Sequence, residues 1–266
     1  MNDSRLRITY IGGPTAIIEW RGLRLLTDPT FDPGGTSYAL PEYTLRKTSG
    51  PALPPDAVGR IDAVLLSHDH HRDNLDDGGR ALVRRAPRVL TTVAGAKRLG
   101  GGAVGMVPWQ TDAIGAFDGA VLRVTATPAR HGPAQGDRGP VIGFALTFED
   151  TPRTVYVSGD TVWFDGVREV GERFDVRTAV LSAGAARVAA AGHFPLTFTA
   201  AETVTVARTF PRATIVPLHC EGWEHFSESC LDVREAFRAA KIEHRLLWLV
   251  AGKPTDVSLD DAPAGG

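Results

Sequence analysis

The sequence has few cysteines, no apolar run long enough to cross a membrane and no excess of positive charge. Cys220 and Cys230 are the only cysteines among 266 residues, and they are not spaced as Cys-x-x-Cys. This usage favours neither a disulfide scaffold nor a structural zinc ribbon, so we expect a reduced, cytoplasmic protein. The first residues pass directly into strand-like sequence, without the apolar core of a secretory signal. We therefore expect no association with a membrane.

The charge balance argues against a protein that binds long nucleic acids. Lysine and arginine total 29 against 31 aspartates and glutamates, for a formal net charge of -2. A general nuclease carries a basic surface for the phosphate backbone, although a local basic pocket is compatible with this composition. A hydrophobic content of 43% is that of an ordinary globular domain. We expect a small-molecule substrate and no nucleic-acid partner, and we leave homo-oligomer formation open.

The hydrophobic pattern predicts one α/β domain over residues 1–252 and a flexible tail over 253–266. The early strands form an antiparallel meander, and a lid loop is predicted over 29–60, where proline, glycine and aromatic residues interrupt any periodicity. Strands and helices then alternate, which predicts two sheets packed face to face with helices outside. The predicted strands are 6–11, 16–20, 23–27, 63–66, 88–93, 103–107, segments within 113–127, 141–148, 153–157, 178–181, 213–217 and 245–250, and the predicted helices are 76–86, 164–174, 199–210 and 228–241.

The densest group of reactive side chains lies in the stretch 65–76, which reads Leu-Leu-Ser-His-Asp-His-His-Arg-Asp-Asn-Leu-Asp. Three histidines and three aspartates fall within nine of these residues, directly after the apolar strand predicted over 63–66. His68 and His70 stand two apart, so on an extended strand end both imidazoles point to the same side and can meet one ion. The stretch therefore predicts a metal site.

A simpler interpretation of this stretch is a solvated loop that leads into a helix. Asp73 or Asn74 would then cap a helix that begins near Leu75. Capping accounts for one polar side chain, but it does not account for three histidines within four positions. We expect both a cap and a metal site.

Three later strands end in a similar way, with a histidine or an aspartate beside a glycine. His131 stands in Thr-Pro-Ala-Arg-His-Gly-Pro, Asp160 in Ser-Gly-Asp-Thr and His219 in Leu-His-Cys-Glu-Gly. Taken alone, His131 is equally well explained as a surface histidine and Asp160 as a helix cap.

These stretches resemble the four motifs of the metallo-β-lactamase superfamily, and the Leu-Leu-Ser-His-Asp-His form is similar to that of the ascorbate-6-phosphate lactonase-like branch. Thr27-Asp28-Pro29 also resembles the family's early Thr-Asp-Pro, whose aspartate supports the ligand histidines. The resemblance covers about residues 8–250. It implies an αββα sandwich, in which two mixed β-sheets pack together with helices on the outer faces. The metal ligands that it implies are His68, His70, Asp73, His131, Asp160 and His219.

The first motif departs from the family's His-x-His-x-Asp-His. Asp73 stands one residue late, and Asn74 follows it where the family has a third histidine. A one-residue insertion around His71 and Arg72 restores the register. We therefore expect His71, Asn74 and Asp28 to bind weakly or to support the ligands from behind, and a second ion to bind less firmly than the first.

The resemblance implies one or two divalent metal ions, with zinc first and manganese or iron as alternatives. His68, His70 and His131 would leave a position open for water, whose pKa falls towards neutrality on the ion, and this supplies hydroxide. Asp160 and Asp73 are the catalytic candidates, with Asp160 orienting the water or moving its proton if only one ion is bound. The expected reaction is hydrolysis of a small-molecule ester or lactone.

Two other functions are compatible with the same motifs. One is a small-molecule phosphodiesterase or a nuclease of this superfamily, and the other is a metal-binding protein without turnover, which would need a closed coordination shell. For the substrate pocket we select Tyr38, Trp163, His193 and Trp223. The competing interpretation is that each aromatic side chain anchors its loop on the core and that His193 is a plain surface residue.

Overall fold

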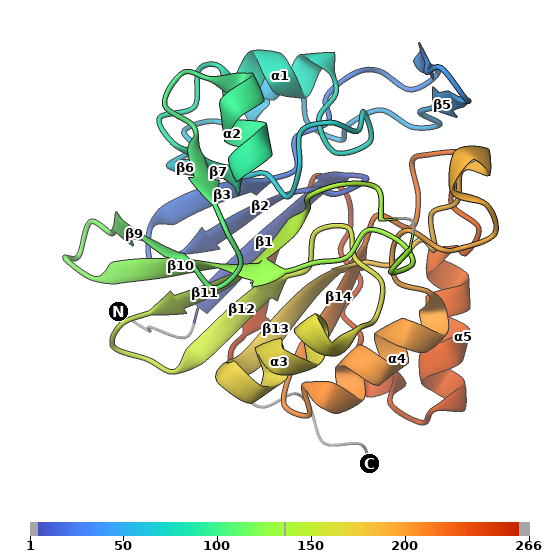
Figure 1. The fold of residues 1–266 in the computed structure, drawn as a ribbon. Helices are drawn as coiled ribbons and strands as arrows, with labels where there is room; N and C mark the ends of the chain where they lie inside the picture. The colour runs from blue at the N-terminus through green and yellow to red at the C-terminus, as the bar shows by residue number, and fades with distance from the viewer. Residues whose placement is uncertain (1–4, 136, 261–266) are drawn as a thin grey trace.

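The computed structural model describes residues 5–135 and 137–260, which form two β-sheets packed face to face (Figure 1). Helices α1 (Asp77–Val83) and α2 (Val93–Leu99) cover the outer face of one sheet, and α3 (Asp165–Arg173), α4 (Ala200–Thr209) and α5 (Cys230–Ala239) cover that of the other. This arrangement confirms the predicted αββα architecture. No helix in the described ranges is long and apolar enough to cross a membrane.

Both sheets change from antiparallel to parallel pairing across their width. The described strands of the first sheet are, in spatial order, β15 (Pro254–Ser258), β1 (Arg5–Gly12), β2 (Thr15–Trp20), β3 (Leu23–Thr27), β6 (Ala63–Leu65), β7 (Val89–Thr92) and β8 (Val104–Met106). Those of the second are β14 (Thr214–Leu218), β13 (Asp175–Ser182), β12 (Arg153–Val157), β11 (Ile142–Phe148), β10 (Val121–Pro128) and β9 (Thr111–Gly115). Pairing is parallel from β3 to β8 and from β12 to β14, where the strands lead into the site loops.

The main core lies between the two sheets and follows from the alternation of side chains along each strand. Leu6 and Ile8 of β1 are buried against this interface, together with Phe144 and Phe148 of β11. Two further apolar clusters join each sheet to its own helices. The central parallel strands are buried on both faces and therefore consist of nearly continuous apolar residues, as in Ala63–Leu65.

The predicted strand over 245–250 and the predicted flexible tail from residue 253 are both wrong. Leu247 and Leu249 pack against the inter-sheet core outside any described strand, whereas β15 pairs with β1 in antiparallel register, Val257 opposite Leu6. Val257 and Leu259 are buried, so this end of the described chain closes the sheet edge. The remainder of the predicted tail, 261–266, lies outside the described residues. Helix α2 was not predicted at all.

The cap of α1 is Asp76 rather than Asp73 or Asn74. Asp76 Oδ1 accepts a hydrogen bond from the Gly79 backbone amide at 2.8 Å, and Asp76 Oδ2 lies 2.9 Å from the buried ammonium of Lys47. The ion pair ties the predicted lid segment to α1. That segment contains a hairpin of β4 (Ser37–Ala39) and β5 (Thr44–Arg46).

A disulfide joins Cys220 to Cys230, contrary to the prediction of a reduced protein without disulfides. Ten residues separate the two cysteines in sequence, and the segment after β14 folds back so that their Cα atoms lie 5.4 Å apart. Sequence spacing alone does not reveal such a return. The bond connects the residue after His219 to the first residue of α5.

Candidate metal centre

The expected ligands lie at the carboxyl ends of strands that run in the same direction within each sheet. His68 follows β6, His131 follows β10, Asp160 follows β12 and His219 follows β14. All four side chains are buried. Strands that end at one edge of a sheet deliver their loops to a common place, as in other open α/β sheets. The sandwich therefore places these side chains together although they are up to 151 positions apart in the chain.

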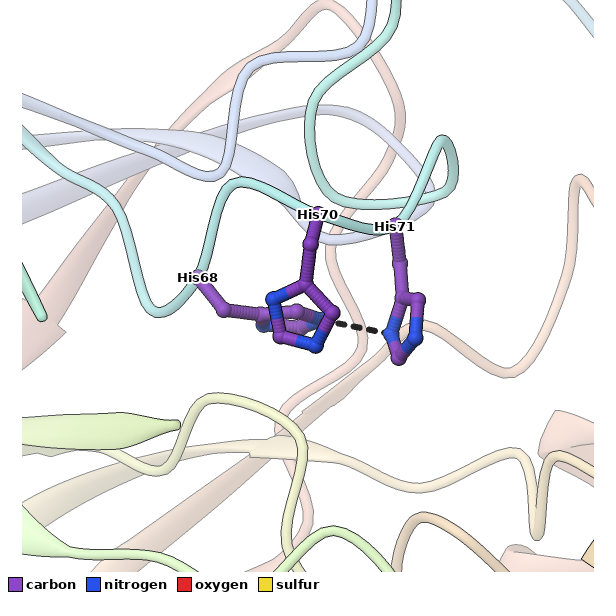
Figure 2. A group of neighbouring side chains, drawn as sticks. All are labelled: His68, His70 and His71. Carbon is purple, nitrogen blue, oxygen red and sulfur yellow. Dashed lines mark hydrogen bonds between the residues drawn. The ribbon is translucent and has the colours of Figure 1, made fainter. Parts of the chain in front are cut away.

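Three imidazoles converge at the centre of this edge. His68 Nε2 lies 3.0 Å from His71 Nδ1, and His131 Nε2 lies 3.1 Å from the same His71 atom. Figure 2 shows His71 and His70 descending from one loop, with a ring nitrogen of His68 directed at His71. Ligand atoms of His68, His131 and Asp160 also lie within 4.8 Å of one another. His71 is thus closer to the centre than the sequence led us to expect.

His70 is held differently from His71. Its Nε2 lies 2.8 Å from the backbone carbonyl of Arg138, which accepts the hydrogen bond. A Cβ on Gly139 would lie 3.1 Å from the same nitrogen, and the positive φ of Gly139 suits this close approach. His70 Nδ1 is buried without a partner among the described residues. Ligand atoms of His68, His70 and His71 also lie within 4.8 Å of one another. His70 and His71 are therefore both near the centre.

The second half of the site is a group of carboxylates and imidazoles. His219 Nδ1 lies 3.1 Å from Asp160 Oδ1, and His219 Nε2 lies 3.8 Å from Asp73 Oδ2. His225 Nε2 makes a shorter contact of 3.0 Å with the same oxygen of Asp73. The backbone of His219 has a φ of 53°, a sparsely populated conformation of the kind that gathers at functional sites.

The charges of the site shift the pKa values of its members in opposite directions. Burial lowers the pKa of His68 well below its ordinary value, and burial together with His131 lowers that of His71 to about 3. Burial alone would raise the pKa of Asp73 and Asp160, but their histidine partners lower both. Burial alone would lower the pKa of His219, yet the neighbouring carboxylates raise it. His68 and His71 are therefore neutral beside the ionised Asp73 and Asp160, which is the protonation state that binds a cation, whereas the raised pKa of His219 favours its protonated form.

Asp28 supports the site through the backbone instead of through an imidazole. Its Oδ1 accepts a hydrogen bond from the Ser67 amide at 2.7 Å, and the Ser67 hydroxyl lies 2.9 Å from His68 Nδ1. Burial and the charge of Asp160 raise the pKa of Asp28 to about 8. The expected contact between Asp28 and a ligand histidine is thus relayed by Ser67.

His131 is oriented from the opposite side. Its Nδ1 donates to the backbone carbonyl of Leu196 at 2.8 Å, which leaves the Nε2 lone pair directed at the centre. Leu196 belongs to the segment after β13, so the position of this segment and the orientation of His131 depend on one another.

The residues fit a divalent cation. Asp160 Oδ2 and His219 Nε2 are buried without a hydrogen-bond partner in the described part of the chain, as is Asn74 Oδ1. Buried polar atoms are rarely left without a partner, and a cation would satisfy the carboxylate and the imidazole. Imidazole nitrogens and carboxylate oxygens without thiolate suit zinc, manganese or iron.

A small cavity of about 10 Å³ adjoins the histidines. Its lining combines apolar side chains with polar groups of the site: Tyr43, Leu45, His71, Asp73, His131, Arg138, Ala186, Val188, Leu196 and His225. The four residues predicted for the pocket lie outside this lining. Tyr38 packs on Trp223, Trp163 packs against the cluster of the second sheet, and His193 is exposed.

His225, Tyr43 and Arg138 line this cavity, although they are not among the four residues selected from the sequence for the pocket. Tyr43 and Arg138 stand in loops whose approach to the histidines depends on the tertiary fold. His225 had one available signal, because it follows His219 by six residues in a segment rich in aromatic and acidic side chains. It carries no family motif, so the signal was not decisive.

Comparisons with known proteins agree on one family and one fold. Residues 23–220 match the family model of the beta-lactamase superfamily domain. The UPF0173 protein YddR of Bacillus subtilis is 24% identical over 235 residues, which are 84% of this chain and 89% of that protein. A UPF0173 metal-dependent hydrolase of Desulforamulus reducens is 22% identical over 244 residues, which are 88% of this chain and 93% of that protein. The crystal structure of an isothiocyanate hydrolase from Delia radicum gut bacteria has a TM-score of 0.80 at 24% identity, over 95% of this chain and 99% of that one.

Proposed function

Because this chain belongs to the beta-lactamase superfamily and is a metal-dependent hydrolase, we propose that it hydrolyses a small-molecule ester or lactone at a centre built on His68, His71 and His131. The observation that carries the proposal is the convergence of these three imidazoles, whose nearest nitrogens are 3.0 and 3.1 Å apart. Ligand atoms at about 2.0–2.1 Å from a tetrahedral zinc ion lie roughly 3.3 Å from one another. The observed spacing is close to this value.

The assignment places the extra residue of the first motif before His71. Under this register His71 is the second ligand histidine, Asp73 is the motif aspartate and His70 is the inserted residue. The hydrogen bond from His70 Nε2 to the Arg138 carbonyl supports this view, because it occupies that nitrogen outside the three-imidazole cluster. His70 then stabilises the backbone at Arg138, beside the site.

Asp160, His219 and Asp73 form the proposed second half of the centre. His219 lies between the two carboxylates, with one nitrogen near each. A second cation here would bind these three side chains. Asn74 would offer it a neutral amide where the motif has an imidazole. We propose that the second cation binds more weakly than the first.

The chemistry then divides between the cation and the protein. A bound divalent cation lowers the pKa of water and polarises the substrate oxygen. When the first cation alone is bound, Asp160 Oδ2, which has no partner within the described residues, would accept the hydrogen bond of a water nucleophile and hold its proton. Leu196 fixes the tautomer of His131 through its carbonyl. The apolar side chains of Leu45, Val188 and Leu196 exclude bulk water around the reacting group.

The cavity supports a compact substrate. A space of about 10 Å³ beside the histidines admits at most about one water molecule, so a substrate enters only if lining segments such as 183–197 move. Apolar walls favour an acyl or alkyl group, and Arg138 is the cationic group at the rim. We therefore place small esters and lactones ahead of phosphodiesters.

The test is a hydrolysis assay on a panel of small esters, lactones, isothiocyanates and phosphodiesters, with protein that has been freed of metal and reloaded with Zn²⁺ or Mn²⁺. We expect hydrolysis of an ester or a lactone by the reloaded protein and none by the metal-free protein. His71→Ala should lose this hydrolysis, whereas His70→Ala, as the matched control in the same loop, should keep most of it. Hydrolysis of phosphodiesters alone would contradict the proposed substrate class. A fully metallated protein that hydrolyses nothing in the panel would contradict the proposal altogether.

A further inference from the structure

Asn74 stands where the motif has a metal-binding histidine, but its side chain is directed towards Ser67, which contacts His68. Its Nδ2 lies 3.5 Å from Ser67 Oγ, and Ser67 contacts the first ligand histidine, His68. Asn74 is fully buried, and its Oδ1 has no partner in the described ranges. The position after Asp73 therefore holds an amide that supports His68 from behind.

His225 approaches the Asp73 carboxylate from a different part of the chain. Its Nε2 donates to Asp73 Oδ2 at 3.0 Å, and His219 Nε2 lies 3.8 Å from the same oxygen. The side chains of His225 and Asp73 are each 10% exposed, so little water competes for this contact. His225 also lines the cavity beside the histidines. An imidazole is thus present at Asp73, although the first motif does not supply it.

The backbone around His225 is fixed on several sides. The Arg187 amide donates to the His225 carbonyl at 2.9 Å, and the Glu224 amide donates to the Arg46 carbonyl at 3.0 Å. The disulfide between Cys220 and Cys230 closes the segment that contains them. Constraints of this kind limit the conformations of a loop, so His225 is delivered to a defined place. A positioning role needs such a rigid support.

We propose that His225 is a positioning residue that replaces the imidazole missing at Asn74 and holds the Asp73 carboxylate ready to bind a second cation beside His219. The inference rests on the proposed metal centre. It requires the hydrogen bond from His225 to Asp73 and requires no contact between His225 and the cation. Residues that orient a metal ligand in this way commonly change metal affinity by about 10–100-fold.

The experiment is a titration of metal-free protein with Zn²⁺ in competition with a chromophoric chelator, for the wild type, His225→Ala, His225→Gln and Glu224→Gln. We expect His225→Ala to weaken the second Zn²⁺ by about 10–100-fold and to leave the first unchanged. His225→Gln should bind both ions nearly as the wild type does, because its amide can donate from about the same place as Nε2. Glu224→Gln is the matched control, since Glu224 is the exposed neighbour of His225 and pairs with Arg46 on the surface.

Circular dichroism of each variant shows whether it is folded, and His225→Leu, which keeps volume without a donor, replaces His225→Ala if truncation unfolds the protein. Equal affinity for the second Zn²⁺ in the wild type and in a folded variant without the donor would overturn the inference. A His225→Gln variant as weak as His225→Ala would also overturn it, because His225 would then act as a ligand itself. The titration needs no substrate, so these results stay distinct from a failure of the proposed hydrolysis.

Discussion

At the scale of single residues, the choice between His70 and His71 shows what one inserted position does to a metal motif. On an ideal strand end His68 and His70 would share a side. The described loop instead turns so that His71 Nδ1 reaches both His68 and His131, and His70 bonds to the Arg138 carbonyl. The strand periodicity predicts that this loop contains ligands, but it cannot predict whether His70 or His71 points towards the centre.

Asp160 is the proposed proton acceptor, and because it is also a proposed ligand of the second cation, its substitution is tested on protein that holds the first cation alone. Its Oδ2 is the free carboxylate oxygen next to the histidines in the described part of the chain, so Asp160→Asn should lower kcat by about 10²–10⁴-fold through loss of the proton acceptor. Steady-state kinetics on the reloaded protein, with metal content measured in parallel, tests this. Asp165→Asn, in the exposed first turn of α3, is the control. Unchanged kcat in Asp160→Asn would assign the proton to another group.

The histidines also predict how the stability of the metal-free protein depends on pH. The pKa of His71 falls from 6.5 to about 3 on folding because the side chain is buried and lies near His131. The unfolded chain therefore binds more protons between about pH 6.5 and pH 3, so the free energy of unfolding should fall as the pH decreases through this window. Urea unfolding of the metal-free protein at a series of pH values measures this dependence.

His71→Gln provides the comparison for that pH series, because glutamine keeps polar character without a titrating group. Its stability should decline less steeply between pH 6.5 and pH 3 than that of the wild type. Identical slopes in the two proteins would mean that His71 is already protonated in the folded state. The other lowered histidine pKa values, those of His68 and His70, should keep part of the slope in both proteins.

At the scale of elements, local chemistry explains several boundaries well. The helix predicted over 199–210 begins at a capping box, because the Thr199 side chain accepts from the Glu202 amide and the Glu202 carboxylate accepts from the Thr199 amide. The cap of α1 was misplaced by two or three residues because Asp73, Asn74 and Asp76 are all good capping residues. The buried ammonium of Lys47, which comes from the β4–β5 region, pairs with Asp76. Such a long-range partner cannot be read from sequence.

The disulfide should stabilise the segment between β14 and α5. Closing a loop of this length restricts the unfolded chain, and we expect reduction, or the double substitution Cys220→Ser with Cys230→Ser, to lower the free energy of unfolding by about 2–3 kcal/mol. Urea unfolding with and without a phosphine reductant measures the difference. The double variant is the control, because the reductant should not change its unfolding midpoint. An equal midpoint for oxidised and reduced wild type would show that the bond adds no stability.

At the scale of the whole molecule, the sequence predicted the architecture better than the details of the site. The alternation of strands and helices and the polar residues at strand ends were sufficient to predict two sheets between helices with a site at one edge. The last strand was misplaced because 245–250 is the more apolar segment, whereas Pro254–Ser258 gains its pairing from β1 at the far end of the chain. The contact between His225 and Asp73 was not predicted for a similar reason, since the two residues lie 152 positions apart.

The cavity and its walls depend on the assembled molecule in the same way. The lining comes from the β4–β5 region, the loop after β6, the loop after β10, the segment after β13 and the disulfide-closed segment after β14. Each of these contributes one to three residues, and none contains a periodic pattern that would mark it. Aromatic residues led to the prediction of a lid, but Tyr38 and Trp223 pack on one another instead of lining the cavity.

The measurement that tests the central claim most directly is a crystal structure of zinc-loaded protein with anomalous data collected at the zinc absorption edge. We predict an anomalous peak bounded by His68 Nε2, His71 Nδ1 and His131 Nε2, with His70 still bonded to the Arg138 carbonyl. A peak coordinated by His70, with His71 turned away, would contradict the register proposed for the first motif. The absence of any peak among these histidines in zinc-loaded crystals would contradict the metal centre itself.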